Sequence, residues 1–325
     1  MTRGRFAPSP TGRMHLGNVF CALLSWLSAK SKGGEWVLRI EDLDPQRSRR
    51  EYAFQLMDDL QWLGLPWDGE PVWQSQRGHI YEEYLHRLQE MGLTYPCYCT
   101  RADIMATQAP HETDGRVVYK GTCRPKDVIS DAENDVADTA RVPTATNHIS
   151  PSIEGGVGVG LATTRLIVPD CTIPFTDGHY GRHDINLAEH CGDYIIRRKD
   201  GAWAYQLAVV VDDALMGVTE IVRGRDLLLS SPQQIHLREL LFPSPLTVDF
   251  LHHPLLCNSE GQRLCKRDKS MDLGYLRDKG TTPQEIIGLL AHYAGLIEQP
   301  YSTGPEELLT LFSWDKVPTE DIITL

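Results

Sequence analysis

The residues best suited to chemistry lie at the first junction between a predicted strand and a predicted helix, within residues 5–18. The segment Pro8-Ser9-Pro10-Thr11-Gly12 fixes a turn, and His15 and Gly17 stand where an apolar helix begins. Backbone amides at a helix N-terminus attract anions, and a histidine there can contact phosphate oxygens. The segment therefore predicts a phosphate site. On its own, the same pattern is also typical of an ordinary turn with a surface histidine.

A second group of chemically active side chains lies at residues 97–123. Cys97, Cys99 and Cys123 supply three thiols over this stretch. Three thiolates favour Zn²⁺ in a tetrahedral structural site, which needs a fourth ligand. His111 is the conventional candidate, because imidazole is a far commoner zinc ligand than phenolate. The alternative is a set of reduced cysteines without a metal.

The elements that must position the first segment alternate between strand and helix. Residues 3–7 predict a short strand and residues 35–40 a buried strand. Between them, apolar residues at helical spacing from Asn18 onward predict a helix that ends near Gly33. This alternation is typical of an α/β domain with a parallel sheet.

Two more helices are expected in the first part of the chain. One should begin with a capping box formed by Ser48 and Glu51 and end at Gly64, and the next should end at Gly92. The apolar stripes of the first three helices are expected to face the core. These stripes are Val19, Phe20, Leu23, Leu24 and Leu27, then Ala53, Leu56, Met57, Leu60 and Leu63, then Tyr81, Tyr84, Leu85, Leu88 and Met91.

The second part of the chain begins with a loop-like insertion. Residues 124–163 are rich in Asp, Thr, Ser, Pro and Gly and carry few apolar residues, which predicts a mobile segment. A helix is expected from Ser231-Pro232, another from a capping box at Thr282-Pro283-Gln284-Glu285 through Leu290, and a short helical C-terminus. Strands are predicted at residues 166–168, 194–197, 207–211 and 220–222.

Composition limits the class of protein. The chain has 325 residues, 41% of them hydrophobic, and a formal net charge of −12, so broad non-specific nucleic-acid binding is disfavoured, although a local basic face can coexist with an acidic whole. We find no apolar run of about 18 residues and no signal-peptide pattern at the N-terminus. We therefore expect a cytoplasmic protein without membrane contact, whose eight cysteines are reduced thiols or metal ligands.

Several motifs together resemble the class I aminoacyl-tRNA synthetases of the glutamyl type. The segment from Ala7 to Asn18 is similar to their HIGH signature. The resemblance continues in order through three further segments: Arg39-Ile40-Glu41-Asp42-Leu43-Asp44, residues 204–213 and Val222-Arg223-Gly224-Arg225-Asp226-Leu227. Four matches in sequence order are a far stronger signal than one.

The resemblance implies a fold, a reaction and a substrate site. The fold is a Rossmann-type nucleotide-binding domain with an inserted zinc-containing subdomain and a short helical C-terminal region. The reaction is attack of the glutamate carboxylate on the α-phosphorus of ATP, with Mg²⁺ accompanying the nucleotide. Glutamate carries two carboxylates and one ammonium group, so its pocket needs cations and an acid. The implied glutamate site contains Arg5, Phe6, Ala7, Pro8, Ser9, Glu41, Tyr205 and Arg223, with Glu41 at the ammonium group and Tyr205 and Arg223 at the remaining carboxylate.

The resemblance assigns ATP to a second set of residues. His15, Gly17 and Asn18 come from the first segment, and Lys266 from a segment that resembles the family's lysine loop, with His15 and Lys266 as the catalytic residues. The family pattern Lys-Leu-Ser-Lys-Arg-Asp corresponds here to Arg263-Leu264-Cys265-Lys266-Arg267-Asp268. Cys265 therefore replaces a hydroxyl. In isolation, Glu41 or Asp42 could instead cap a helix, and Arg223 could pair with Asp226.

The zinc ligands and the domain limits also follow from the resemblance. It suggests Tyr119 as the fourth ligand beside Cys97, Cys99 and Cys123, with His111 still open. The expected domains are residues 1–96 and 191–245 as the halves of the Rossmann domain, 97–190 as the inserted subdomain with a flexible loop at 124–163, and 246–325 as the lysine loop and C-terminal helices.

The region after Lys266 decides which branch of the family is the best match. Only 59 residues follow Lys266, whereas glutamyl-tRNA synthetases continue into a sizeable helical anticodon-binding region. The chain thus most resembles the branch that attaches glutamate to the modified base queuosine of tRNA(Asp). The implied partners are L-glutamate, ATP and the anticodon arm bearing queuosine, for a monomeric enzyme. A truncated synthetase that charges the tRNA 3′ end and a non-catalytic RNA-binding relative are the alternatives.

Overall fold

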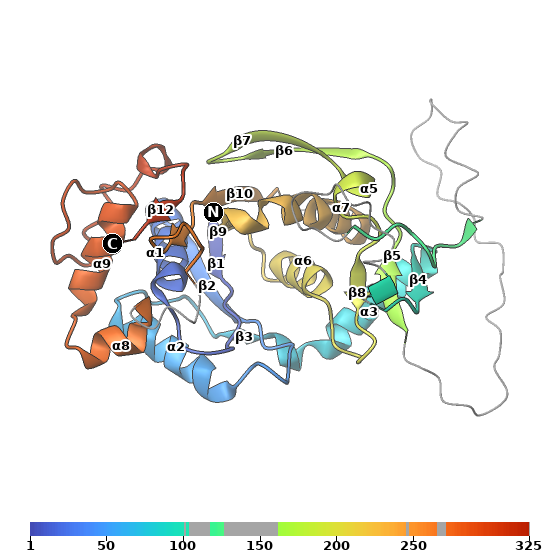
Figure 1. The fold of residues 1–325 in the computed structure, drawn as a ribbon, viewed down its shortest axis with the longest axis horizontal. Coiled ribbons are helices and arrows are strands. Elements are labelled where there is room, and N and C mark those ends of the chain that lie inside the picture. Colours follow the sequence, from blue (N-terminus) through green and yellow to red (C-terminus); the bar gives the residue numbers. More distant parts are fainter. Residues whose placement is uncertain (101, 104–117, 127–161, 245–246, 265–270, 325) are drawn as a thin grey trace.

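A seven-stranded sheet lies at the centre of the fold (Figure 1). The computed structural model describes residues 1–100, 102–103, 118–126, 162–244, 247–264 and 271–324. The strand order is β3-β2-β1-β9-β10-β6-β7, and neighbouring strands are parallel except in the β6–β7 hairpin. The strands are β1 (Arg3–Phe6), β2 (Glu35–Ile40), β3 (Val72–Trp73), β6 (Thr172–Asp177), β7 (Gly181–Asn186), β9 (Glu220–Gly224) and β10 (Asp249–His253). The predicted α/β fold with a mostly parallel sheet is confirmed.

Helix α1 (Leu16–Lys30) packs against β1, β2 and β9. All five residues of its predicted stripe are fully buried, and each large apolar side chain contributes about 1.5–3 kcal/mol to folding when it leaves water. The helix ends before Gly33, which adopts a φ of 63° that favours glycine. The apolar spacing therefore predicted both the helix and its buried face.

Helices α2 (Arg50–Trp62) and α3 (Gly78–Glu90) are followed by Gly64 and Gly92, as predicted. The capping box at Ser48 is wrong. The N-cap of α2 is Arg49, whose extended backbone donates to the carbonyl of Pro10, so Ser48 lies outside the helix. Met91 also differs from its prediction, because it follows the last residue of α3 and is 52% exposed.

The segment predicted as a strand at residues 207–211 is part of helix α6 (Tyr205–Leu215). The run Leu207-Ala208-Val209-Val210-Val211 is apolar and rich in β-branched residues, which favours a strand in isolation. All five of these residues are buried, together with Asp212 and Asp213. A helix buried on every side gives the same continuous apolar run as a buried strand, so periodicity could not separate the two.

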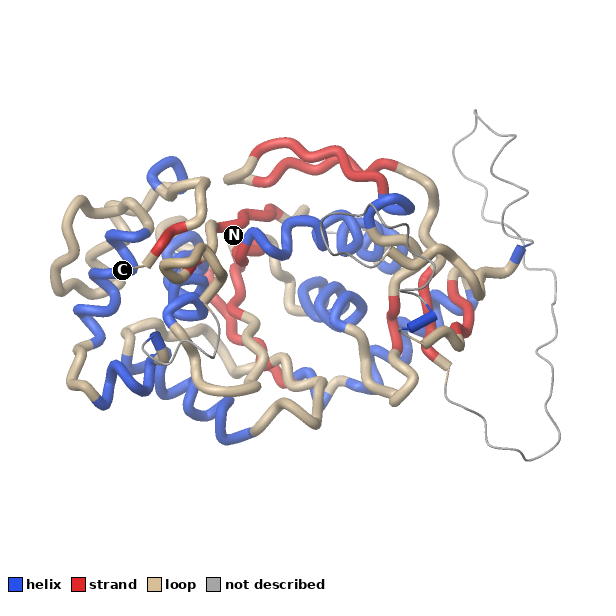
Figure 2. Tube along the Cα trace, in the orientation of Figure 1, coloured by secondary structure: helices blue, strands red, loops and turns tan. Residues whose placement is uncertain are grey.

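A smaller antiparallel sheet lies at the far end of the molecule from the C-terminal helices (Figures 1 and 2). It contains β4 (Thr94–Cys97), β5 (Thr163–Leu166) and β8 (Ile195–Arg197). The strand predicted at residues 166–168 corresponds to β5, which begins three residues earlier, at Thr163. The apolar core beside this sheet includes residues of α3, α6 and α7 (Ser231–Leu241), the helix expected from Ser231-Pro232. The short helix α5 (Leu187–His190) follows β7.

The C-terminal part combines two helices with a small parallel ladder. The helices are α8 (Leu273–Asp278) and α9 (Pro283–Tyr293), and the ladder pairs β11 (Leu256–Cys257) with β12 (Ile322–Ile323). The capping box of α9 is confirmed by reciprocal hydrogen bonds between Thr282 and Glu285. After Tyr293 the described chain forms turns, a 3₁₀ segment η5 (Trp314–Lys316) and β12, so the helical part of the predicted C-terminal region is short and consists of α8 and α9. Among the described residues, no helix is long and apolar enough to span a membrane.

Candidate active site

A cavity of about 640 Å³ lies at the carboxyl ends of β1, β2 and β9. The chain leaves β1 toward β2 on one side, while β9 flanks β1 on the other. Such a change of direction opens a crevice where α/β sheets bind ligands. Eleven predicted substrate residues line this cavity, and Lys266 lies outside the described residues. The eleven are Arg5, Phe6, Ala7, Pro8, Ser9, His15, Gly17, Asn18, Glu41, Tyr205 and Arg223.

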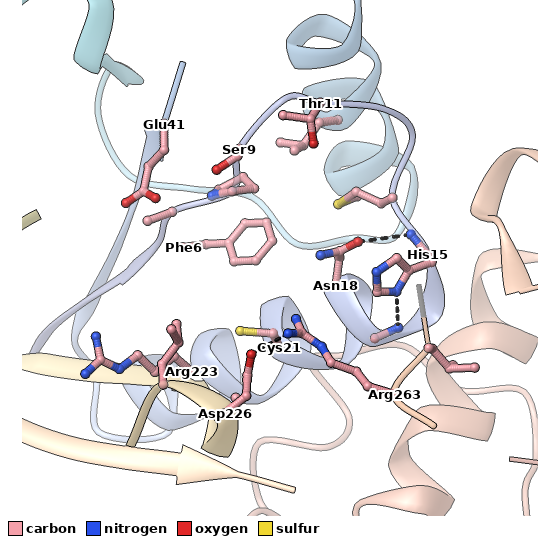
Figure 3. Close-up of a pocket in the computed structure, with 18 of the residues that line it drawn as sticks. Phe6, Ser9, Thr11, His15, Asn18, Cys21, Glu41, Arg223, Asp226 and Arg263 are labelled. Atoms are coloured by element: carbon pink, nitrogen blue, oxygen red, sulfur yellow. Dashed lines mark hydrogen bonds and ion pairs between the residues drawn. The ribbon is translucent and has the colours of Figure 1, made fainter. Parts of the chain in front are cut away.

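His15 caps the helix that follows it (Figure 3). Its Nδ1 accepts a hydrogen bond from the Gly17 amide at 3.1 Å, and its own amide donates to Oδ1 of Asn18 at 3.1 Å. A Cβ at residue 17 would come within 2.9 Å of the His15 ring, so any larger residue would displace the capping imidazole. The amides of Asn18 and Val19 donate to the His15 carbonyl. The expectation that the helix amides face an anion therefore does not hold for these three, whose protons are used within the first turn.

Glu41 follows β2 and faces the cavity from beside a buried arginine. Arg39 donates from Nη2 to Oε1 of Glu41 at 3.0 Å and from Nη1 to Oδ1 of Asp213 at 2.5 Å. Burial raises the pKa of the Glu41 carboxyl, although Arg39 acts in the opposite direction. Glu41 does not cap a helix, whereas Asp42 accepts from the amide of Ser75 at 2.8 Å.

Beneath the cavity, buried ionic groups link the sheet to α6. Asp212 accepts from Nε of Arg77 at 2.6 Å, from Gln74 at 2.8 Å and from the Tyr81 hydroxyl at 2.7 Å. Asp213 lies 3.5 Å from Nε of Arg5. We call Arg39, Asp212 and Asp213 the charge layer. The sequence analysis missed it, because two adjacent aspartates at the end of an apolar run give no sign that they are buried.

Arg223 lies in β9, and only 4% of it is exposed. Its Nε donates to Nε2 of His252 at 2.9 Å, its Nη1 to Oε1 of Gln234 at 2.7 Å and its Nη2 to Oγ of Ser231 at 2.9 Å. All three acceptors are neutral, and within the described chain no carboxylate forms an ion pair with this guanidinium. Burial lowers the pKa of Arg223. The cation is thus desolvated without a counter-charge of its own.

The possible pairing of Arg223 with Asp226 is not seen. Asp226 instead forms an ion pair with Arg263, the first residue of the segment that resembles a lysine loop (Figure 3). Arg223, Asp226 and Arg263 lie on one side of the cavity, and Ser9 and Thr11 lie on the other.

Cys21 and His253 are among the cavity residues that were not singled out from the sequence. Burial raises the pKa of the Cys21 thiol to about 11, so it stays protonated at neutral pH. Burial lowers the pKa of His253 to about 4, which keeps that imidazole neutral. Neither residue belonged to a recognised motif: Cys21 lies in α1 one turn after Gly17, and His253 is the last residue of β10.

The cysteine group at the smaller sheet is brought together as expected. Ligand atoms of Cys97, Cys99 and Cys123 all lie within 4.8 Å of one another. The sulfurs of Cys99 and Cys123 are 3.5 Å apart, too far for a disulfide. The Tyr119 hydroxyl is 3.4 Å from the Cys97 sulfur and 3.9 Å from that of Cys99. Zn–S bonds of about 2.3 Å in a tetrahedron separate two sulfurs by about 3.8 Å, so these donors fit one metal ion. His111 lies outside the described residues.

Comparison with known proteins gives a consistent result. A family model described as "tRNA synthetases class I (E and Q), catalytic domain" matches residues 1–297. Two curated relatives are named glutamyl-Q tRNA(Asp) synthetase. The one from Symbiobacterium thermophilum is 42% identical over 333 residues, spanning 99% of this chain and 95% of the relative. The one from Nitratidesulfovibrio vulgaris is 40% identical, spanning 100% and 96%.

Solved structures extend the similarity to the fold. A glutamate tRNA ligase from Elizabethkingia meningosepticum, crystallised in complex with its amino acid, is 26% identical with a TM-score of 0.73, and the match covers 97% of this chain and 65% of that one. A glutamate-tRNA synthetase from Elizabethkingia anophelis is 25% identical with a TM-score of 0.76, and covers 100% and 68%. The chain thus spans about two thirds of the length of these two structures.

Proposed function

The chain belongs to the class I tRNA synthetase family of glutamate and glutamine enzymes, and from this premise we propose that it activates glutamate with ATP and transfers it to the queuosine base of tRNA(Asp). Full-length similarity to the glutamyl-Q tRNA(Asp) synthetases supports this acceptor. The observation that carries the proposal is the cavity itself, which is lined by a buried arginine whose hydrogen-bond acceptors are neutral and by the partly buried carboxyl of Glu41.

The reaction has two steps. A carboxylate oxygen of glutamate attacks the α-phosphorus of ATP, the bond to the β-phosphate oxygen breaks, and pyrophosphate leaves. A hydroxyl on the cyclopentene ring of queuosine then attacks the carbonyl carbon of the glutamyl-adenylate, loses its proton and releases AMP. The first step needs no nucleophile from the protein, so positioning and stabilisation of charge are what the cavity has to supply.

The glutamate site has the charges that the substrate requires. Arg5 and Arg223 are the buried cations of the cavity, and Glu41 is an acid beside them. In the proposed pose, Glu41 accepts hydrogen bonds from the ammonium group of glutamate. Arg5 and Ser9 also belong to the amino-acid site. Tyr205 and Arg223 hold the carboxylate that is not activated. Phe6, Ala7 and Pro8 form the wall between these groups. A desolvated guanidinium forms strong charge-assisted bonds to a carboxylate.

ATP is proposed to lie against the start of α1. His15, Gly17 and Asn18 line that part of the cavity, and Lys266 would bring its ammonium group to the triphosphate. Because Nδ1 of His15 is used as a helix cap, only the Nε2 edge of the ring can contact a phosphate oxygen. Mg²⁺ would accompany the nucleotide and offset the negative charge of its phosphates.

The cysteine group is proposed to hold one structural Zn²⁺. The ligands would be Cys97, Cys99, Cys123 and Tyr119, whose donor atoms already lie at distances that suit a tetrahedral ion. Bound there, the metal would tie the end of β4 to the segment around Tyr119. Metal content of the purified protein should fall from about one zinc per chain to below half in Cys97→Ser. A Tyr119→Phe variant that keeps full zinc, beside a His111→Ala variant that loses it, would assign the fourth ligand to His111 instead.

The function is tested by the fate of labelled glutamate. Purified protein is incubated with ATP, Mg²⁺, labelled glutamate and tRNA(Asp) that carries either queuosine or unmodified guanine at the same position. Label on the queuosine form alone supports the proposal. Label on both forms, abolished when the 3′ ribose is blocked, would mean charging of the tRNA end. Glutamate-dependent exchange of pyrophosphate into ATP, measured without tRNA, tests the activation step separately.

A further inference from the structure

The guanidinium of Arg223 is the end of a buried hydrogen-bonded chain that begins in the β6–β7 hairpin. Its next member is His252 in β10, and the last is Asp177, the final residue of β6. Nδ1 of His252 lies 2.6 Å from Oδ2 of Asp177. Arg223, His252 and Asp177 are 4%, 0% and 1% exposed. We propose that Asp177 and His252 are positioning residues that fix the guanidinium of Arg223 for the glutamate carboxylate.

The direction of each hydrogen bond follows from the chemistry of the three groups. A guanidinium can only donate, so Nε2 of His252, 2.9 Å from Nε of Arg223, must accept and carries no proton. The single proton of the neutral imidazole then lies on Nδ1 and is donated to Asp177. A proton on Nε2 would place two donors face to face. The arrangement therefore selects one tautomer, and a carboxylate partner is the usual means of holding it.

Asp177 is itself fixed by the turn of the hairpin. Its Oδ1 accepts from the amides of His179 at 3.0 Å and Tyr180 at 2.9 Å, and its Oδ2 faces the imidazole. The backbone amide of His252 adds longer contacts of 3.3 Å to Oδ1 and 3.2 Å to Oδ2. Burial alone would raise the pKa of Asp177, but hydrogen bonds from His252 and the two turn amides hold it below its ordinary value. The turn packs closely against β10: a Cβ on Gly178 would come within 2.8 Å of the Leu251 side chain, which would have to shift. The hairpin thus presents one carboxylate oxygen in a fixed place.

Three further contacts leave Arg223 little freedom. Gln234 and Ser231 accept from its terminal nitrogens, and its guanidinium lies 5.3 Å from the centre of the Phe250 ring. These groups come from α7 and β10, whereas Asp177 comes from the hairpin. No residue of the β6–β7 hairpin is among the described residues that line the cavity. The hairpin therefore acts on the substrate only through Arg223.

The test uses Asp177→Asn in the full chain and rests on the proposed function. Oδ1 of the new side chain can still accept from the turn amides and from the His252 amide. Its NH₂ group then faces the imidazole and donates to Nδ1, and only the long contact of Oδ2 with the His252 amide is given up. The imidazole proton then moves to Nε2 and opposes Arg223. In pyrophosphate exchange the KM for glutamate should rise at least tenfold, while the KM for ATP and kcat stay within about twofold, as expected when uniform binding of a non-reacting group is lost.

The ¹⁵N resonances of His252 give a readout that a purely structural role would not move. The ligand-free wild type should show the proton on Nδ1, and Asp177→Asn should show it on Nε2. The idea is overturned by an Nε2 proton in the wild type. It is also overturned when the variant changes tautomer but keeps its KM for glutamate, or when the two KM values rise together. Absence of glutamate-dependent exchange in the wild type would instead refute the proposed function.

A matched pair at position 252 keeps the test decisive if Asp177→Asn does not fold. In His252→Gln the amide oxygen can take the place of Nε2 and accept from Arg223, whereas in His252→Asn the shorter amide reaches only Asp177. The KM for glutamate should stay within about threefold for Gln and rise at least tenfold for Asn. Equal KM values in the two variants would overturn the inference.

Discussion

Two buried arginines on either side of β1 show how one residue type serves two purposes. Arg39 in β2 pairs with the aspartates of the charge layer, and Arg223 in β9 faces the cavity. Burial alone would lower the pKa of Arg39, but Asp213, Glu41 and Asp212 outweigh it and hold the pKa above its ordinary value. Burial lowers the pKa of Arg223. Arg39 forms ion pairs with Asp213 and Glu41, whereas Arg223 forms no ion pair with a carboxylate among the described residues.

The difference separates stability from binding. A buried cation that is paired with carboxylates supports the fold, because removing it leaves those carboxylates without a counter-charge. A buried cation held by neutral acceptors retains its attraction for an anion from outside. The proposed glutamate site therefore depends on a charge that the fold holds in place and leaves without an ionic partner. Three predictions test this contrast.

The largest effect is expected from Arg39→Met. The variant would leave Asp213 and Asp212 buried without their shared cation, and we expect the free energy of unfolding in urea to fall by about 3–5 kcal/mol. Arg182→Met is the matched control, because Arg182 pairs with Asp184 on the surface and its loss should have no measurable effect on the free energy of unfolding. A loss for Arg39→Met no larger than that of the control would contradict the role of the charge layer.

Arg223→Met is expected to lower the free energy of unfolding less than Arg39→Met does, but to weaken glutamate binding more. Loss of the proposed charge-assisted contact should weaken glutamate binding by about 2–4 kcal/mol, or roughly 30- to 1000-fold, with ATP binding unchanged. The free energy of unfolding should fall by less than in Arg39→Met, because no carboxylate loses its ion-pair partner. Calorimetric titration with glutamate and urea unfolding measure the two effects separately. Unchanged glutamate affinity would remove Arg223 from the site.

The comparison also explains what the sequence could predict. The segment from Arg5 to Asn18, Glu41, Tyr205 and Arg223 could be assembled into one site because each lies in a motif that carries a recognisable order of residues. The structure brings all of them to one cavity. Short-range features such as the Thr282 capping box were predictable for the same reason, since their partners are neighbours in the chain.

The supporting residues could not be found in this way. Asp177, His252 and Asp213 act through contacts between segments far apart in the sequence, such as the 75 residues between Asp177 and His252. A lone buried aspartate carries no local signature. The helix at residues 205–215 was missed because an apolar run buried on all sides has no periodicity to read. Tertiary packing, which the sequence does not display locally, determines both the burial of these supporting residues and the helical state of residues 205–215.

The smallest predicted effect concerns Glu41, where stability and binding should change in opposite directions. Burial raises the pKa of this carboxyl above its ordinary value of 4.5. The ionised form is therefore disfavoured in the folded protein. The stability that the Glu41 carboxyl contributes is fully present below its pKa in the unfolded chain, and it is lost as the pH rises through its pKa in the folded protein. Glu41→Gln should thus unfold at a higher urea concentration than the wild type at pH 7–8, by on the order of 1 kcal/mol.

The same substitution removes the acid proposed to bind the ammonium group. Glutamate affinity should fall although the fold becomes more stable. Such an opposite change is expected where a binding site contains a charged group that burial disfavours. The stability gain should shrink toward zero near pH 4, where the wild-type carboxyl is itself protonated. A gain that is constant between pH 4 and pH 8 would show that Glu41 is not the titrating group. Equal or tighter glutamate binding by the variant would remove Glu41 from the ammonium site, leaving Arg223 as the main electrostatic contact to the substrate.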